Sequence, residues 1–252
     1  MPERSDGTTA LVERPVPDWH PGEDTTALLA ARERRFAEQA DPAEDVVRWV
    51  TDRYAPKVVL ACSFGAEDCV LVDMVSRLEV EVTAFYLDTG LLFPETYATR
   101  DRLAARYGVR FVRVRPAQDV EAQAATHGPA LWRRAPDRCC ALRKVEPLRA
   151  HLSTQDAWIT GVRREQSPQR ATAPHVGWDA RFGLVKASPL AGWTHADVQR
   201  YLHERAVPHN PLHAKGFPSI GCWPCTRAVR PGEDPRAGRW AGHVKTECGL
   251  HA

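Results

Sequence analysis

Short apolar runs alternate with amphipathic stretches along most of this chain, and this alternation constrains the fold more than any other feature. Apolar runs typical of buried strands lie at 57–64, 82–87, 110–114, 157–162 and 184–187. Helical spacing of apolar residues lies between them, at 67–77, 95–107 and 140–152. This order predicts an α/β fold with a doubly wound, mostly parallel sheet, in which ligands bind beyond the carboxyl ends of the strands.

Composition divides the chain into three parts. Residues 1–26 are rich in Pro, Asp, Glu and Thr and lack apolar periodicity, so we expect a disordered leader. Residues 27–206 predict one main α/β domain, since a chain of 252 residues with 43% hydrophobic residues can supply one substantial core. Residues 207–252 are rich in Pro, Gly, Arg, His and Cys, so we expect a metal site or packing against the main domain to hold this C-terminal segment.

The formal net charge is only +2, which gives no support for a surface that binds nucleic acid or membranes as a whole. No apolar run approaches the roughly 18 residues that a membrane span needs, and the N-terminus lacks the apolar core of a secretory signal. We therefore expect a cytoplasmic protein. Its seven cysteines should be kept reduced there, which favours metal ligation or catalysis over disulfides.

Basic residues nevertheless crowd two stretches of the chain, as though two walls faced a small anion. A solvated charged face is the alternative interpretation of each stretch taken alone. The two stretches contain Arg133, Arg134, Arg138, Arg143, Lys144 and Arg149, and Arg227, Arg230, Arg236, Arg239 and Lys245.

Two turns that follow predicted strands are suited to binding a nucleotide. The first, at 63–68, reads Ser-Phe-Gly-Ala-Glu-Asp and opens a helix, where Gly65 lets the backbone approach a ligand and amide hydrogens can bind a phosphate or sulfate oxygen. The second, at 87–90, reads Leu-Asp-Thr-Gly and closes the next strand. Strand-turn-helix junctions with Ser and Gly are common, so a purely structural turn remains an alternative for the first.

The two turns resemble those of the PP-loop family of adenine-nucleotide enzymes, whose motif is Ser-Gly-Gly-x-Asp-Ser. Phe64 and Asp68 depart from that motif. The form found here resembles the sulfonucleotide reductase branch, which argues against ATP pyrophosphatase chemistry.

Four cysteines form a second constellation: Cys139 and Cys140 are adjacent, and Cys222 and Cys225 make a Cys-x-x-Cys pair. Four thiolates can hold a tetrahedral zinc ion or a cubane iron-sulfur cluster, and spacing alone does not choose between them. Neighbouring side chains at a helix start reach one large cluster more readily than one small ion. Burial as apolar residues is the alternative for the first pair. A zinc site completed by histidines is another, with His203, His209 and His213 as the candidates.

Four motifs together resemble assimilatory adenosine 5'-phosphosulfate (APS) reductases, and the resemblance extends from about residue 57 to the end. The motifs are CCALRK at 139–144, GVRREQS at 161–167, GCWPCTR at 221–227 and ECGLH at 247–251. Relatives that use the 3'-phosphorylated nucleotide (PAPS) generally lack the four cysteines. The resemblance therefore implies APS as substrate and a 4Fe-4S cluster as cofactor.

The resemblance also implies a role for individual residues. It assigns the cluster ligands to Cys139, Cys140, Cys222 and Cys225. It assigns sulfate and phosphate contacts to Lys144, Arg170, Arg236, Arg239 and His251, and nucleotide contacts to Ser63, Phe64, Gly65, Leu87 and Gly161.

Cys248 stands four residues from the end of the chain, where a flexible tail could deliver its thiolate to a bound anion and withdraw it again. We expect this thiolate to attack the sulfur of APS, giving an enzyme S-sulfocysteine and AMP. The family implies that thioredoxin then releases sulfite, as part of sulfate assimilation for cysteine biosynthesis. Cys62 and Cys69 are instead expected to be packing residues.

Three other functions remain as alternatives at this point. They are a PAPS reductase, a PP-loop enzyme that adenylates or thiolates a substrate with ATP, and a non-catalytic metal-containing regulator that binds nucleic acid through its basic stretches. The sequence does not fix the oligomeric state, and a homo-oligomer is among the states left open.

Overall fold

A six-stranded sheet forms the centre of the computed structural model, which describes residues 23–243, 245 and 247–250. The strand order is β3-β2-β1-β4-β6-β5, and all neighbours are parallel except β5 and β6. The predicted α/β fold with a mostly parallel sheet is therefore confirmed. The strands are β1 (Val58–Ala61), β2 (Thr83–Leu87), β3 (Phe111–Val114), β4 (Ala157–Ile159), β5 (Val176–Asp179) and β6 (Leu184–Ala187).

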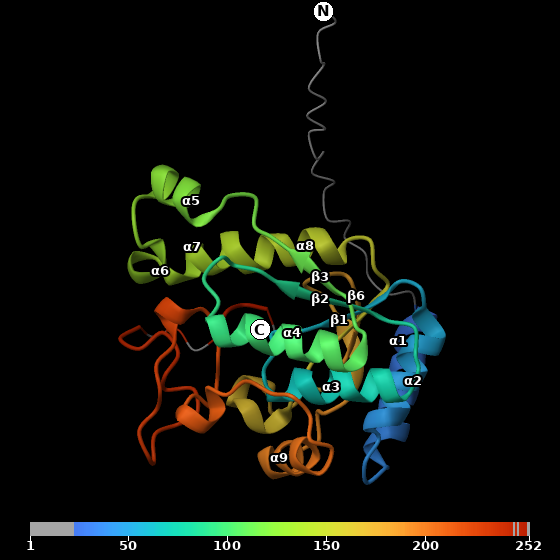
Figure 1. The fold of residues 1–252 in the computed structure, drawn as a ribbon. Coiled ribbons are helices and arrows are strands. Elements are labelled where there is room, and N and C mark those ends of the chain that lie inside the picture. Colours follow the sequence, from blue (N-terminus) through green and yellow to red (C-terminus); the bar gives the residue numbers. More distant parts are fainter. Residues whose placement is uncertain (1–22, 244, 246, 251–252) are drawn as a thin grey trace, which may run out of the picture.

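Both faces of the sheet are covered by helices, and for this reason the strands are apolar on both sides. Figure 1 shows α7 and α8 on one side of the strands and α3 and α4 on the other. The helices are α1 (Glu23–Ala37), α2 (Ala43–Tyr54), α3 (Ala66–Arg77), α4 (Pro94–Tyr107), α5 (Val120–His127), α6 (Leu131–Arg134), α7 (Pro136–Cys140), α8 (Glu146–Leu152) and α9 (His195–Glu204).

Alternate residues of the central strands enter two different hydrophobic clusters. In β1, Val58 and Leu60 belong to the larger cluster, which also contains the buried faces of α2, α3 and α9. Val59 points the other way and packs with Leu148 and Leu152 of α8. This period of two along a strand fixes the register, because a slip by one residue would exchange the two clusters.

The chain reverses its direction of winding between β1 and β4. Val59 pairs with Thr83 of β2 on one side and with Trp158 of β4 on the other, so the loops that follow β1 and β4 separate to opposite faces. A crevice forms at such a switch point, at the carboxyl ends of the strands. Ser63 and Gly161 therefore lie on either side of this crevice.

The helix predicted at 140–152 is longer and less regular than its sequence pattern suggests. It begins at Pro136 as α7, passes through a single π-helical stretch (Ala141–Val145) and continues as α8. The wider π-turn changes the direction in which successive side chains project, and such turns are common at functional sites. Arg143 and Lys144 lie within it and are both buried.

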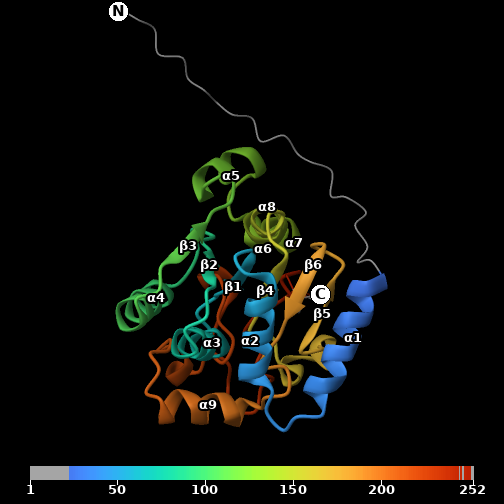
Figure 2. The ribbon, with the colours of Figure 1, turned by 90° about the vertical axis from the view of Figure 1, so that its right-hand side faces the viewer.

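Two features at the β5 edge were not predicted. Strand β5 pairs antiparallel with β6, and α1 packs beside it, as Figure 2 shows. The Glu33 carboxylate of α1 accepts a hydrogen bond from the Val176 amide at 3.0 Å. Helix α1 begins at Glu23, so residues 23–26 are helical and do not belong to the predicted leader, whose residues 1–22 lie outside the described part of the chain.

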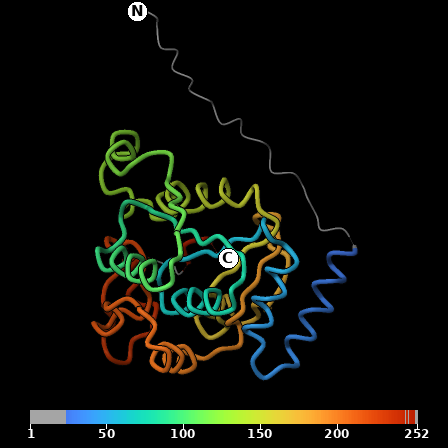
Figure 3. The backbone as a smooth tube through the Cα atoms, turned by 45° about the vertical axis from the view of Figure 1, so that its right-hand side comes forward, coloured from blue at the N-terminus to red at the C-terminus, as the bar shows by residue number. Residues whose placement is uncertain are grey.

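The C-terminal segment, residues 207–250, lies on the opposite side of the molecule from α1 (Figure 3). In its described residues it contains two short 3₁₀ helices, His213–Lys215 and Trp223–Cys225, and it joins the main domain through backbone contacts. The Trp223 amide donates a hydrogen bond to the Leu91 carbonyl at 2.8 Å, and Leu92 forms an isolated antiparallel β-bridge with Cys222. Among helices of the described residues, none has the length and apolar character needed to span a membrane.

Candidate active site

The turn after β1 is held by Asp68, the second acidic residue of α3. The Ser63 amide and the Ser63 hydroxyl both donate to Asp68 Oδ2, each at 2.6 Å. Phe64 takes a positive φ of 62°, and its ring is buried against Tyr86 and Phe111. The turn therefore presents its backbone and Ser63 outward, while the Phe64 side chain anchors it to the core.

A cavity of about 740 Å³ opens at the carboxyl ends of the strands, next to this turn. Its size lies within the range of about 300–1,000 Å³ that is usual for small-molecule sites. It brings together every described residue for which the sequence predicted catalysis or substrate contact. Those residues are Ser63, Phe64, Gly65, Leu87, Lys144, Gly161, Arg170, Arg236, Arg239 and Cys248. His251, predicted to contact sulfate, lies outside the described residues.

The loop after β4 contributes a network that the sequence did not single out residue by residue. Arg163 is buried and donates through Nε to Glu67 Oε1 at 2.8 Å, and Gln166 donates to the same oxygen at 3.0 Å. These bonds tie the predicted motif at 161–167 to the first turn of α3. Only the tertiary structure shows this link, since Glu67 and Arg163 are far apart along the chain.

The four basic side chains that the sequence predicted on the cavity wall fall into two pairs. Arg170 and Arg236 each form an ion pair with Glu247, at 2.9 and 3.0 Å. Among the described residues, neither Lys144 nor Arg239 forms an ion pair with a carboxylate. Arg239 instead donates to Ser219 Oγ at 3.1 Å and lies over the Trp240 ring. Glu247 was missed as a site residue, and its position beside Cys248 was the available signal.

Cys248 lies on the same wall and is half-buried. Burial acts to raise its pKa, but the charges of Lys144 and Arg239 and a hydrogen bond from the Leu250 backbone act the other way. The outcome is a pKa of Cys248 below that of an ordinary thiol. By contrast, Cys62 and Cys69 are buried, although Cys62 borders the cavity, and burial raises the pKa of both thiols.

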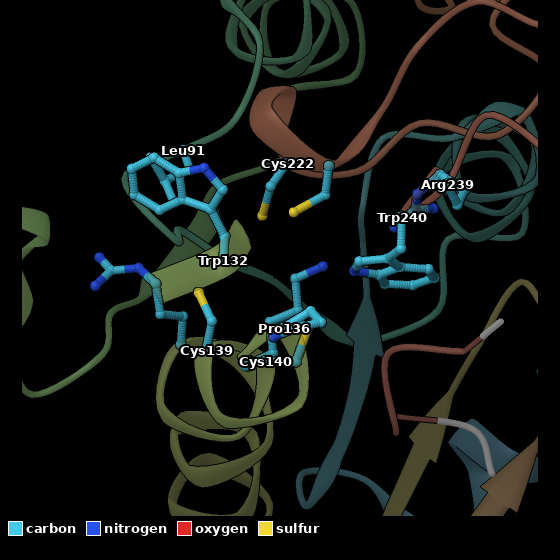
Figure 4. A pocket seen from close by; sticks show the side chains of 11 residues that line it. Leu91, Trp132, Pro136, Cys139, Cys140, Cys222, Arg239 and Trp240 are labelled. Atoms are coloured by element: carbon cyan, nitrogen blue, oxygen red, sulfur yellow. The ribbon is translucent and has the colours of Figure 1, made fainter. Parts of the chain in front are cut away.

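A second, smaller pocket is lined by Cys139, Cys140, Cys222 and Cys225. In Figure 4 the sulfurs of Cys139 and Cys222 point into this pocket from opposite sides, one from α7 and one from the C-terminal segment. Thr89 Oγ1 lies 3.3 Å from the Cys222 sulfur. The two cysteine pairs, which are distant along the chain, therefore meet in one pocket, as the sequence predicted.

The donor set of this pocket fits a cubane cluster, which takes four cysteine ligands. Arg143 and Lys144 also line the pocket, and within the described residues neither is paired with a carboxylate, so an anionic group there would balance buried positive charge. Within the described residues, no three Cys, His, Asp or Glu side chains are arranged to hold a single metal ion. His209 and His213 contact the backbone carbonyls of Val207 and Phe217 through Nδ1.

Lys144 and Arg239 line both the cysteine pocket and the larger cavity. Burial acts to lower the pKa of Lys144, but the neighbouring thiols of Cys222, Cys248 and Cys140 outweigh it and raise that pKa. The two spaces therefore share one group of positive charges.

The fold and the site thus describe an α/β protein whose cavity at the carboxyl ends of the strands is lined by a thiol and by several basic side chains. The family model described as the phosphoadenosine phosphosulfate reductase domain matches residues 57–228. The adenosine 5'-phosphosulfate reductase of Shouchella clausii is 47% identical over 82% of this chain and 87% of its own length. The phosphoadenosine 5'-phosphosulfate reductase of Gloeobacter violaceus is 50% identical over 92% of this chain and 96% of its own length.

A solved structure agrees with these relatives. The crystal structure of phosphoadenylyl-sulfate reductase from Candida auris matches with a TM-score of 0.70 and 29% identity, covering 83% of this chain and 98% of that one. The chain belongs to the phosphoadenosine phosphosulfate reductase family and is an oxidoreductase that acts on a sulfur group.

Gly161 allows the β4 loop to pack directly on the start of α3. A Cβ at this position would lie 2.6 Å from Asp68 Oδ1 and 2.9 Å from the Glu67 Cβ. We expect Gly161→Ala to lower the free energy of unfolding by about 1–3 kcal/mol through overpacking, measured by urea denaturation. Gly65→Ala is the matched control, since a Cβ there meets nothing closer than 3.5 Å. Equal stability of the two variants would contradict this account.

Titration of the buried Asp68 carboxyl should make the free energy of unfolding depend on pH. Burial raises its pKa to about 6, against the two hydrogen bonds from Ser63. A carboxyl with a raised pKa stabilises the fold below its ordinary pKa, and this contribution is lost as the pH rises through about 6. Between pH 4 and 7 we expect the free energy of unfolding of the wild type to fall by about 2 kcal/mol relative to Asp68→Asn. If urea denaturation gave the same pH dependence of the free energy of unfolding for the wild type and Asp68→Asn, the raised pKa of Asp68 would be contradicted.

Proposed function

We propose that this chain reduces adenosine 5'-phosphosulfate to sulfite and AMP, with Cys248 as the nucleophile. One observation carries the proposal: a half-buried thiol with a lowered pKa faces a nucleotide-sized cavity, next to two cations without a carboxylate partner in the described residues. An anionic substrate would supply the missing negative charge. The name of the Shouchella clausii relative and of others supports APS as that substrate.

The cavity offers separate places for the two ends of such a substrate. The turn after β1 and the loop after β4 supply Ser63, Gly65 and Gly161 near the switch point, where the adenosine would lie. Lys144, Arg170, Arg236 and Arg239 supply the basic part of the wall, where the phosphate and sulfonyl oxygens would lie. Cys248 lies on this basic wall, so the reacting sulfur would meet the thiol there.

In the proposed transfer, the Cys248 thiolate attacks the sulfonyl sulfur in line with the bond between that sulfur and the phosphate oxygen. A sulfur-sulfur bond forms as the sulfur-oxygen bond breaks, and AMP leaves with the electron pair. Lys144 and Arg239 face both the anionic nucleophile and the sulfonyl oxygens. Fixed cations of this kind stabilise a transition state by a few kcal/mol each, on the order of magnitude seen for other preorganised charges.

A dithiol, which we infer to be thioredoxin, then releases sulfite from the S-sulfocysteine. One thiolate attacks Cys248 Sγ and displaces sulfite, leaving a mixed disulfide. The second thiol resolves that disulfide, restoring Cys248 and oxidising the dithiol by two electrons. The proposal includes a role in sulfate assimilation for cysteine biosynthesis and a location in the cytoplasm, whose reducing conditions keep these thiols free.

We infer that Cys139, Cys140, Cys222 and Cys225 hold a 4Fe-4S cluster. Bound there, it would supply a fixed anionic centre beside the sulfate site and hold the C-terminal segment to α7. Lys144 would then be positioned between the cysteine pocket and the cavity, with its ammonium directed by charge on both sides.

PAPS is the second candidate substrate, because the relative from Gloeobacter violaceus carries the name of a PAPS reductase at 50% identity. Sulfite formation from APS and from PAPS, assayed in parallel with thioredoxin on anaerobically purified protein, decides between them. We expect sulfite from APS, and sulfite from PAPS alone would overturn the substrate assignment.

Cys248→Ser should abolish the covalent intermediate, because a hydroxyl is a far weaker nucleophile than a thiolate. With APS and no reductant, mass spectrometry should detect one added SO₃ group on the C-terminal peptide of the wild type and none on the variant. Cys69→Ala, which removes an enclosed thiol outside the site, should still form the adduct. An adduct on the Cys248→Ser chain would show that the nucleophile is another residue.

Cys222→Ser should prevent assembly of the cluster, because one of four ligands is lost. We expect iron content to fall from roughly four atoms per chain to a small fraction of that. The C-terminal segment should also become more sensitive to limited proteolysis, since a connection to α7 is lost. Cys69→Ala is again the control. Unchanged iron and sulfide content in Cys222→Ser would refute this ligand set.

A further inference from the structure

Leu250 is the last described residue of the chain, and its side chain packs against the main domain. It contacts the smaller hydrophobic cluster, whose buried members include Phe85, Leu148 and Trp158. These three side chains come from β2, α8 and β4. The contact therefore attaches the tail, residues 247–250, to a surface that three elements of the main domain build together.

The same surface forms part of the wall of the cavity. Its apolar wall, made of residues that line the cavity and also belong to or pack against the smaller cluster, consists of Ala61, Phe85, Leu87, Leu148, Trp158 and Leu250. Ala61 and Leu87 are the last residues of β1 and β2, so this wall lies at the carboxyl ends of the strands. Burying a phosphate against apolar side chains would be costly, whereas the face of a nucleotide base suits them.

A tight turn joins Leu250 to Cys248. Gly249 between them has a φ of 81°, a left-handed conformation that glycine adopts without steric cost. The Leu250 amide donates a hydrogen bond back to the Cys248 sulfur. A Cβ at Gly249 would lie 3.7 Å from Val145 Cγ2, so the turn lies beside the π-helical stretch that carries Lys144. The position of the thiol therefore depends on where Leu250 is held.

The thiol of Cys248 lies between two attachments of the tail. On one side, Glu247 forms ion pairs with Arg170 and Arg236. On the other side, Leu250 makes the apolar contact. Without that contact, the backbone after Cys248 would keep the wide conformational freedom of a glycine. Leu250 therefore restricts the positions that the thiol can take.

We propose that Leu250 positions the nucleophile: its side chain docks on the apolar wall, holds the thiol of Cys248 on the cavity wall, and forms one surface of the site for the nucleotide's base. This inference rests on the proposed function and adds a residue at the uncharged end of the substrate. Leu250 lies against the base and not against the reacting sulfur, so it acts on the transfer through Cys248.

Binding of the base and docking of Leu250 stabilise each other. Leu250 is only partly buried and lines the cavity, so part of its surface is available to a base. Covering that surface removes apolar area from water, which favours both the bound base and the docked leucine. Coupling of this kind is reciprocal. The base of the substrate thereby helps to place the thiol that attacks the sulfonyl group of the same molecule.

The first experiment measures how readily iodoacetamide reaches Cys248 in the cluster-loaded enzyme without ligand, quantified on the C-terminal peptide. It is run above the pKa of an ordinary thiol, about 8.5, so that access and not ionisation sets the rate. We expect Leu250→Ala to react several-fold faster than the wild type, because its tail is held only on the Glu247 side of the thiol. Leu250→Met, which keeps an apolar side chain of similar size, should react at the wild-type rate.

Leu92→Ala is the matched control. Leu92 is also partly buried and lines the cavity, but it packs against the larger cluster and lies outside the tail. Its variant should react at the wild-type rate. Equal rates for Leu250→Ala and the wild type would overturn the proposal. An equal acceleration of Leu250→Ala and Leu92→Ala would overturn it too, because the effect would then not depend on the tail.

The second experiment repeats the alkylation with adenosine, which has the base but no phosphate, and with ribose 5-phosphate, which has no base. Each ligand is used at saturation, established by calorimetry for each chain. Adenosine should slow the wild type several-fold and leave Leu250→Ala unchanged, whereas ribose 5-phosphate should affect both chains alike. If adenosine protected both chains equally, or left the wild type unprotected, the contact between Leu250 and the base would be refuted.

The outcome for the proposed function is separate. If APS adds no SO₃ group to wild-type Cys248, the proposed transfer fails, while the alkylation rates without ligand still decide whether Leu250 holds the thiol. If the adduct forms, its rate of formation at saturating APS should be roughly tenfold lower in Leu250→Ala, because a displaced nucleophile reacts more slowly, and normal in Leu250→Met. An unchanged rate in Leu250→Ala would overturn the positioning role.

Discussion

Lys144 is a buried ammonium whose neighbours are thiols and a guanidinium, and within the described residues it has no carboxylate partner. A charge in such a place must be balanced, because an unpaired buried ion is costly. The groups available to balance it are Cys248, the cysteines of the smaller pocket and an anion in the cavity. This one constraint accounts for the meeting of the cysteine pocket, the Cys248 thiol and the basic wall of the cavity at the same turn of the α7–α8 helix.

The π-turn at Ala141–Val145 makes this convergence possible. It follows the cysteine pair directly and carries Arg143 and Lys144, both of them buried. Arg143 is fixed by backbone carbonyls, among them that of Thr89 at 2.6 Å, whereas Lys144 reaches both the cysteine pocket and the cavity. In a regular α-helix the side chains of Arg143 and Lys144 would project at a different angle to one another, because its turn is tighter than a π-turn. The local irregularity therefore positions the charge that the chemistry requires.

Few apolar side chains of the C-terminal segment are buried in its described part, and specific contacts hold the segment instead. Trp240 is its buried aromatic residue, and the Trp240 amide donates to the Cys225 carbonyl at 2.9 Å. Glu247 adds ion pairs with Arg170 and Arg236. The segment is therefore attached at two places, at the cysteine pairs and beside Cys248.

The sequence by itself determined the mostly parallel α/β fold, five of the six strands and ten of the residues that line the cavity, because buried strands and short motifs leave local patterns. Periodicity alone could not specify β5, which is an edge strand that depends on β6, or the π-turn, whose residues have ordinary helical composition. It also gave no role to Glu247, since a carboxylate acquires meaning only from the arginines it meets. Only the tertiary structure decided which distant charges face one another, because burial and proximity, rather than position along the chain, set their electrostatic partners.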